Sequence, residues 1–222
     1  MNLVEDYLKD IQLFSSLDER QMVKLVSISK IEEIQRGDIL FYEKDLSTKI
    51  YYIISGAVKL YKVDRFDNEI FLYRAEDGSF LFDFSMFDDS YSFGRYSNAE
   101  LIEDSTILSI ELEEFKSYYF NDMNIFNSMF KECVMMVKRY ECIINRDIVF
   151  DGTAKVAHML VNDINSINTL KKHEIAYMLH IQPETLSRIL KKLERNNSIM
   201  VQKGKIKILD KQALINIYDD RG

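Results

Sequence analysis

One stretch constrains the fold more than any other: residues 170–209, LKKHEIAYMLHIQPETLSRILKKLERNNSIMVQKGKIKIL. Its pattern predicts a helix, a tight turn, a second helix and then a short β-hairpin. Pro183, the only proline in the chain, fits the first turn of the second helix, where a missing N–H costs nothing. Gln182, just before it, is the expected N-cap. The short turn and the small Ala176 allow the two helices to cross closely, as in a helix-turn-helix.

Helical spacing separates two faces of the second helix. The apolar stripe consists of Leu186, Ile189, Leu190 and Leu193. The charged face consists of Glu184, Ser187, Arg188, Lys191 and Arg195. A solvated helix surface would also be charged, and Glu184 and Arg188 have the spacing of an i,i+4 ion pair. The preceding helix favours the other interpretation, in which this face meets DNA.

In a helix-turn-helix, the second helix enters the major groove and its N-terminal residues meet base edges. Arginine can donate two hydrogen bonds to guanine, and a carboxylate can accept one from cytosine. We therefore expect Glu184, Ser187 and Arg188 to read bases. Contacts to phosphate position a protein without reading sequence, and the candidates for them are Lys171, Lys172, Lys191, Lys192, Arg195, Lys203 and Lys205.

Residues 183–190, PETLSRIL, resemble the recognition helix of the Crp/Fnr family of bacterial transcription regulators. The order E-x-x-S-R, at Glu184, Ser187 and Arg188, is similar to the Fnr branch, and this resemblance implies a half-site that begins TTGA. The Crp branch usually has glycine where Ser187 stands. The chain departs from the family at His180, where the turn often has glycine; histidine tolerates a positive φ better than a bulky apolar residue.

Charge is divided unevenly along the 222 residues, whose net charge is −7. Residues 151–222 hold 12 basic and 8 acidic side chains, and the first 150 residues hold 17 basic and 28 acidic ones. We expect only the basic tail to face phosphate. The acidic start predicts no signal peptide, and no apolar run approaches the ~18 residues of a membrane span. A cytoplasmic location is the expectation.

Between residues 31 and 110 the hydrophobic period changes toward two, which is typical of strands. The expected strands are Ile39–Tyr42, Ile50–Ile54, Ala57–Val63, Glu69–Tyr73, Ser97–Leu101 and Thr106–Ile110. Gly37 and Gly56 are expected to let the chain turn between them. Short strands with regular turns favour a small antiparallel roll. Residues 37–41 and 51–58 resemble the cyclic-nucleotide-binding β-roll (jelly roll) of the Crp/Fnr family, which implies an α+β fold.

The resemblance also implies an effector pocket, at Phe82, Asp83, Phe84, Arg95, Tyr96 and Tyr140. Nucleotide-binding members have a glycine where Phe82 stands and an Arg-Ser pair at Arg95-Tyr96. Arg95 can still pair with an anion, but the ring of Phe82 should block a phosphate. Cyclic AMP is therefore not the expected effector. An aromatic cluster either lines an apolar ligand site or fills the roll: Phe80, Phe82, Phe84, Phe87 and Phe93.

Cofactor ligands are scarce. The Fnr branch proper binds a 4Fe–4S cluster through N-terminal cysteines, but residues 1–132 contain none. All three histidines, His158, His173 and His180, lie in the basic tail, which disfavours haem bound in the sensor. Cys133 and Cys142 are expected to be structural thiols. We find no catalytic triad, phosphate-cradling glycine loop or metal-binding spacing, so an enzyme is not expected.

One long helix is predicted from Asp122 to Ile148, with two apolar stripes. The first, expected to form a dimer seam, comprises Met129, Cys133, Met136, Tyr140 and Ile143. The second, expected to pack on the roll, comprises Phe126, Phe130, Val134, Val137, Ile144 and Ile148. The alternative is a helix buried within one monomer.

Three parts are expected: a sensor domain over 1–120, a dimerisation helix over 121–150 and a winged helix-turn-helix over 151–222. The hypothesis is a homodimeric regulator that reads TTGA-like inverted repeats, controlled by an effector other than cyclic AMP or by none. Its expected partners are double-stranded DNA and, if it activates, RNA polymerase. The alternative is a ligand-binding roll whose C-terminal domain contacts proteins rather than DNA.

Overall fold

A computed structural model describes residues 3–82, 94–202 and 204–219. The chain divides into two compact units, residues 1–138 and 139–222. The division falls within the long helix α4 (Met123–Ile144), and each unit is described by itself. The expected boundaries near residues 120 and 150 stay a prediction.

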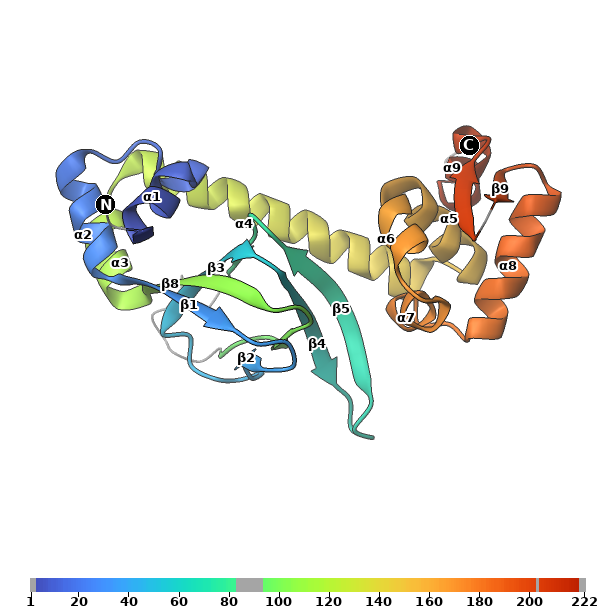
Figure 1. The fold of residues 1–222 in the computed structure, drawn as a ribbon, viewed down its shortest axis with the longest axis horizontal. Coiled ribbons are helices and arrows are strands. Elements are labelled where there is room, and N and C mark those ends of the chain that lie inside the picture. The colour runs from blue at the N-terminus through green and yellow to red at the C-terminus, as the bar shows by residue number, and fades with distance from the viewer. Residues whose placement is uncertain (1–2, 83–93, 203, 220–222) are drawn as a thin grey trace. The chain divides into compact units, whose positions relative to one another are not determined.

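The first unit is built on two four-stranded antiparallel sheets, ordered β1-β8-β3-β6 and β2-β7-β4-β5 (Figure 1). The strands are β1 Ser29–Ile34, β2 Ile39–Phe41, β3 Lys49–Ser55, β4 Ala57–Val63, β5 Glu69–Glu76, β6 Phe80–Leu81, β7 Asn98–Leu101 and β8 Ser105–Glu111. The pattern of the sequence found six of these and missed β1 and β6. No residue of β1 is fully buried, so it has no clear alternation, and β6 has only two residues.

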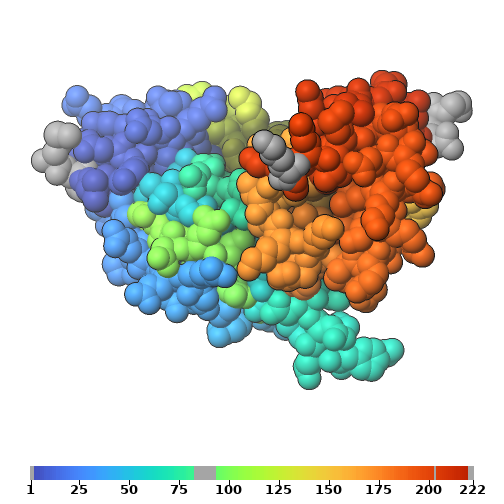
Figure 2. Space-filling model, turned by 45° about the vertical axis from the view of Figure 1, so that its right-hand side comes forward, coloured from blue at the N-terminus to red at the C-terminus, as the bar shows by residue number. Residues whose placement is uncertain are grey.

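Residues from both sheets form the core of the roll. Its buried members are Ile53, Val58, Leu60, Ala75, Leu81, Ala99, Leu101 and Ile107. Gly56 joins β3 to β4 with φ +102°, and a Cβ there would lie 2.1 Å from Ser105 Oγ. Gly37 also has a positive φ, of +92°. Both glycines therefore turn the chain as expected. The β4–β5 hairpin stands out from the rest of the roll in the space-filling view (Figure 2).

Short helices gather beside one end of the roll (Figure 1). They are α1 Leu3–Asp10, the 3₁₀ turn η1 Gln12–Phe14, α2 Glu19–Ser27 and α3 Leu112–Tyr119. Asp18 begins α2 with a capping box: its carboxylate accepts from the Gln21 N–H at 2.7 Å, and Gln21 Oε1 accepts from the Asp18 N–H at 2.9 Å. Tyr119 ties α3 to α2, because its hydroxyl donates to the Gln21 carbonyl at 2.8 Å.

The second unit contains a helical domain with a β-hairpin wing. Its elements are α5 Gly152–Asn162, α6 Ile164–Thr169, α7 Lys172–Met178, α8 Pro183–Arg195, β9 Ile199–Gln202, β10 Lys205–Ile208 and α9 Lys211–Tyr218. Asp151 caps α5 by accepting from the Ala154 N–H at 2.8 Å. Apolar residues from all five helices and both strands share one core, so the helix-turn-helix rests on a continuous packed base.

The long helix differs from its prediction in length and in the use of its faces. It ends at Ile144 and continues as a π-helical turn, η3 (Asn145–Val149). Met129 and Met136 of the expected seam are only 2% and 6% exposed within the single chain. The stripe expected to pack on the roll is exposed instead, at 45% for Phe126, 61% for Phe130 and 56% for Val137.

The expectation that this second stripe packs on the roll is therefore wrong. Cys133, Tyr140 and Ile143 of the expected seam are half-buried, so that seam is largely covered by its own chain. Spacing shows that two apolar stripes exist but not which one faces the core. Unbranched methionines fit an irregular core surface well. None of the helices in the described ranges is long and apolar enough to cross a membrane.

Candidate nucleic-acid interface

The helix-turn-helix is formed by α7, the turn at residues 179–182 and α8. His180 has φ +51° in the turn, and the Ile181 N–H donates to the Ala176 carbonyl at 3.0 Å. Ala176 is 1% exposed, as its small side chain at the helix crossing predicts. Gln182 is the N-cap of α8, but its side chain makes no capping hydrogen bond, so only its position was predicted correctly.

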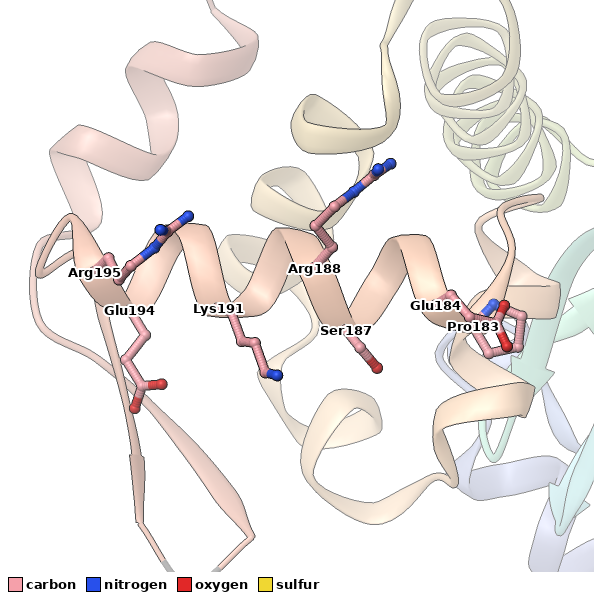
Figure 3. Close-up of a pocket in the computed structure, with 7 residues that line it drawn as sticks. All are labelled: Pro183, Glu184, Ser187, Arg188, Lys191, Glu194 and Arg195. Atoms are coloured by element: carbon pink, nitrogen blue, oxygen red, sulfur yellow. The ribbon is translucent and has the colours of Figure 1, made fainter.

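The two faces of α8 lie as the spacing predicts. Leu186, Ile189 and Leu193 are buried in the shared core, and Leu190 packs against its edge. A shallow groove runs along the opposite face, lined by Pro183, Glu184, Ser187, Arg188, Lys191, Glu194 and Arg195 (Figure 3). In this view Arg188 extends to one side of the helix, and Ser187 and Lys191 to the other. Glu184 and Arg188 are both exposed, and Ser187 is half-buried.

Glu184 and Arg188 do not neutralise each other. Across the ranges that the structure describes, no ion pair or hydrogen bond joins these two side chains. Glu194 is different, because it accepts a hydrogen bond from the Val201 N–H of β9 at 3.1 Å. The carboxylate and guanidinium at the start of α8 thus remain available to groups outside the chain.

The expected phosphate contacts lie on the surface. Those exposed are Lys171, Lys172, Lys191, Lys192, Arg195 and Lys205. Lys203 lies outside the described residues. The wing itself is held by Asn168 of α6, whose amide donates to the Ile206 carbonyl at 3.0 Å and accepts from the Ile206 N–H at 2.6 Å. This anchor was missed, because no local pattern marks an asparagine that pairs with a distant strand.

In the roll, Arg95 is engaged by its own chain. Its side chain is buried, at 4% exposure. One guanidinium nitrogen donates to the Lys49 carbonyl, and the guanidinium lies 4.3 Å from the ring centroid of Phe41 and 5.3 Å from that of Tyr51. Such stacking stabilises a buried guanidinium. These contacts hold Arg95 within the roll, and its expected role in an effector pocket stays a prediction.

Other expected pocket residues are also in contact with the chain. The hydroxyls of Tyr96 and Tyr73 share a hydrogen bond at 2.8 Å. Phe82 is 8% exposed and stacks on Phe80 with 4.8 Å between ring centroids. This part of the aromatic cluster supports the core-filling interpretation. Asp83, Phe84, Phe87 and Phe93 lie outside the described residues, and Tyr140 is half-buried in the second unit.

The described residues include no group of three or more His, Cys, Asp or Glu side chains placed to hold a metal ion. Cys133 is half-buried and Cys142 is exposed. Burial raises the pKa of the Cys133 thiol, and the nearby Glu132 raises it further. A raised pKa makes a thiol less reactive, which agrees with a structural role for Cys133.

Comparison with known families places both units. A model of the cyclic nucleotide-binding domain matches residues 31–122, and a model of the Crp-like helix-turn-helix domain matches residues 154–217. A sensor-type β-roll followed by a winged helix-turn-helix defines a class of DNA-binding transcription regulators. The chain belongs to the Crp/Fnr family of that class, which is not enzymatic.

Individual relatives are distant but cover nearly the whole chain. The cyclic AMP receptor protein of Thermus thermophilus is 20% identical over 217 residues, 95% of this chain and 98% of that protein. A Crp/Fnr-family regulator from Eubacterium rectale is 20% identical, with a TM-score of 0.69 over 94% of this chain and 98% of its own. A CooA variant from Carboxydothermus hydrogenoformans is 19% identical, with a TM-score of 0.72 over 94% and 95%.

These findings confirm the family, the α+β fold and the DNA-binding class of function. The alternative of a roll whose C-terminal domain only contacts proteins is set aside.

Proposed function

We propose that this protein is a cytoplasmic, homodimeric regulator that reads inverted repeats of TTGA-type half-sites. One observation carries the proposal: Glu184 and Arg188 stand one turn apart, exposed and not paired with each other, on the outward face of the second helix of a helix-turn-helix. Their order with Ser187 resembles that of the Fnr branch.

The chemistry of these side chains suits a G·C base pair. Arg188 can donate two hydrogen bonds to guanine O6 and N7, and Glu184 can accept one from cytosine N4. A good bidentate pair of this kind discriminates between bases by about 1–3 kcal/mol. The exposed lysines of α7 and α8 would bind phosphates and set the register of the helix on DNA. RNA polymerase would be a further partner if the protein activates transcription.

The direct test is fluorescence anisotropy of the full chain with a labelled duplex that carries a TTGA inverted repeat. The control duplex has the same composition in scrambled order, at the same salt concentration, because salt changes all such affinities. We expect tighter binding to the repeat. Equal affinity for both duplexes would show that the protein does not read this sequence.

The exposed stripe of α4 supports a dimer. Its members are Phe126, Phe130, Val134, Val137 and Ile144, with Ile148 following in η3. Exposed apolar surface of this extent favours association, and the intervals of three and four residues suit a coiled-coil seam. Dimerisation along this stripe would present two recognition helices to successive major grooves ~34 Å apart. The dimer surface that we propose is thus the second stripe of α4, not the first.

Two matched substitutions test the seam. Val137 and Met135 are both 56% exposed, but Met135 lies on a neighbouring face of the helix. We expect Val137→Glu to shift the protein toward monomer in sedimentation velocity runs, because it places a charge in the seam. Met135→Glu should leave the dimer intact. Equal behaviour of the two variants would place the dimer contact elsewhere.

We propose further that cyclic AMP is not the effector. Arg95 is stacked and hydrogen-bonded inside the roll, and Phe82 packs on Phe80, which leaves little at these positions to receive a phosphate. An apolar effector and control without any effector both fit these contacts. A thermal-shift screen with nucleotides, fatty acids and thiols separates the two. Stabilisation by cyclic AMP would overturn the pocket argument.

A further inference from the structure

A cluster of charged side chains joins the end of the long helix to the turn of the helix-turn-helix. Asp147, in η3, accepts two hydrogen bonds from Arg146, from Nε and Nη2, both at 2.7 Å. Its Oδ1 also lies 3.2 Å from His180 Nδ1. The side chains of Asp147 and His180 are only 21% and 25% exposed. Residues 33 positions apart in sequence thus meet where η3 approaches the turn before α8.

The same segment has a second anchor at Phe150, three residues after Asp147. The ring of Phe150 lies 5.5 Å from that of His158 on α5 and 5.7 Å from that of Tyr218 on α9, between ring centroids. His158 and Tyr218 also meet edge to face at 5.0 Å. Asp147 therefore holds this segment to the turn before α8, and Phe150 holds it to α5 and α9. A π-helical turn such as η3 is rare and frequently marks a functional position.

The pKa shifts of the nearby groups agree with a contact that depends on charge. Burial raises the pKa of Asp147, but the hydrogen bonds from Arg146 and His180 outweigh burial and hold that pKa well below its ordinary value. Burial lowers the pKa of His158, and the nearby charge of Arg146 lowers it further. Asp147 thus stays a carboxylate near neutral pH. His158 gains a proton only at lower pH than an ordinary histidine.

We propose that the hydrogen bond between His180 and Asp147 is a pH-sensitive latch between the carboxyl end of the long helix and the turn that carries the recognition helix. Histidine is the side chain that ordinarily changes charge between about pH 5 and 8. A protonated imidazole opposite a carboxylate adds the attraction of opposite charges to the hydrogen bond. The latch therefore tightens as pH falls through this range.

Among the groups described around the latch, Asp147 is the acceptor of the hydrogen bond from His180. Arg146 faces it from η3, and His158 faces Arg146 from α5. In the ranges that the structure describes, no other ion pair reaches Asp147 or His180. Arg146 keeps its charge throughout this pH range, and the pKa of His158 is lowered, so neither group accounts for a change near neutral pH.

Hydrogen–deuterium exchange of the full chain at pH 6 and pH 8, corrected for intrinsic rates, tests the latch. We expect peptides covering residues 145–150 and 180–186 to be protected about two- to fivefold more at pH 6, the range of a partly exposed ion pair. His180→Asn should abolish this difference, since asparagine accepts the positive φ of the turn but does not titrate. Asp147→Asn should abolish it too.

The matched control is His173→Asn, which removes an exposed histidine of α7 outside the latch and should preserve the difference. The proposal is overturned if the wild type shows no difference, if His180→Asn retains it, or if His173→Asn also removes it. The readout needs no DNA, so it stays valid even if the protein fails to read TTGA repeats. One consequence rests on the proposed function: specific affinity should rise from pH 8 to pH 6 in the wild type but not in His180→Asn.

Discussion

Two arginines, one in each unit, show that the same type of side chain can be buried within the fold or exposed on its surface. Arg95 is buried in the roll, stacked on Phe41 and bonded to the Lys49 carbonyl. Arg188 is exposed on α8 and makes no ion pair with Glu184 within the described ranges. The family resemblance implies an external partner for both. Arg188 is exposed to such a partner, whereas the contacts described for Arg95 lie within the roll.

The largest effect expected from this contrast is on DNA binding. Arg188→Ala should weaken binding to a TTGA inverted repeat by about 1–3 kcal/mol per half-site and relax the choice at one base pair. The free energy of unfolding should change by less than ~0.5 kcal/mol, as for other surface substitutions. Anisotropy titrations and urea unfolding measure the two quantities. An equal loss of affinity on scrambled DNA would contradict base reading by Arg188.

Substitution of the buried arginine should change stability rather than DNA affinity. Arg95→Leu removes the donor to the Lys49 carbonyl, and we expect it to lower the free energy of unfolding by about 1.5–3 kcal/mol, the range for a hydrogen bond from a charged group. Arg65 provides a matched control, because it also stacks on a phenylalanine, Phe66, at 4.7 Å, but is exposed. Arg65→Leu should change stability little. Equal effects of the two in urea unfolding would remove the distinction between packed and free guanidinium groups.

A smaller effect is expected at the acidic partner of the latch. Because the pKa of Asp147 is lowered in the folded chain, its contribution to stability is present above the ordinary carboxyl pKa of about 4 and is lost as pH falls below it. Asp147→Asn should therefore destabilise the protein by about 1 kcal/mol at pH 7. The difference from wild type should shrink in urea unfolding below pH 4. A constant difference at all pH values would mean that charge is not the cause.

The smallest change concerns phosphate contacts. Lys191→Ala should weaken binding to all sequences alike and reduce the slope of log affinity against log salt by about 1. Lys30→Ala, an exposed lysine of the acidic first unit, should leave that slope unchanged. If both variants give the wild-type slope, Lys191 does not contact phosphate.

The sequence by itself determined what depends on local periodicity and spacing. Alternation revealed six strands of the roll, and helical spacing separated the buried Leu186, Ile189 and Leu193 from the exposed Arg188 on the same helix. Pro183 marked the first turn of α8 because its missing N–H costs nothing only at the start of a helix. Such features need no knowledge of distant residues.

Only the tertiary structure decided which surfaces and side chains meet. Spacing showed two apolar stripes on α4, but folding chose Met129 and Met136 for the core and left Phe130 and Val137 outside. The contacts of Arg95 with Lys49, of Asn168 with Ile206 and of Asp147 with His180 span 46, 38 and 33 positions of sequence. No local pattern signals a contact of that kind, because the attraction exists only after the packed elements have brought the two side chains together.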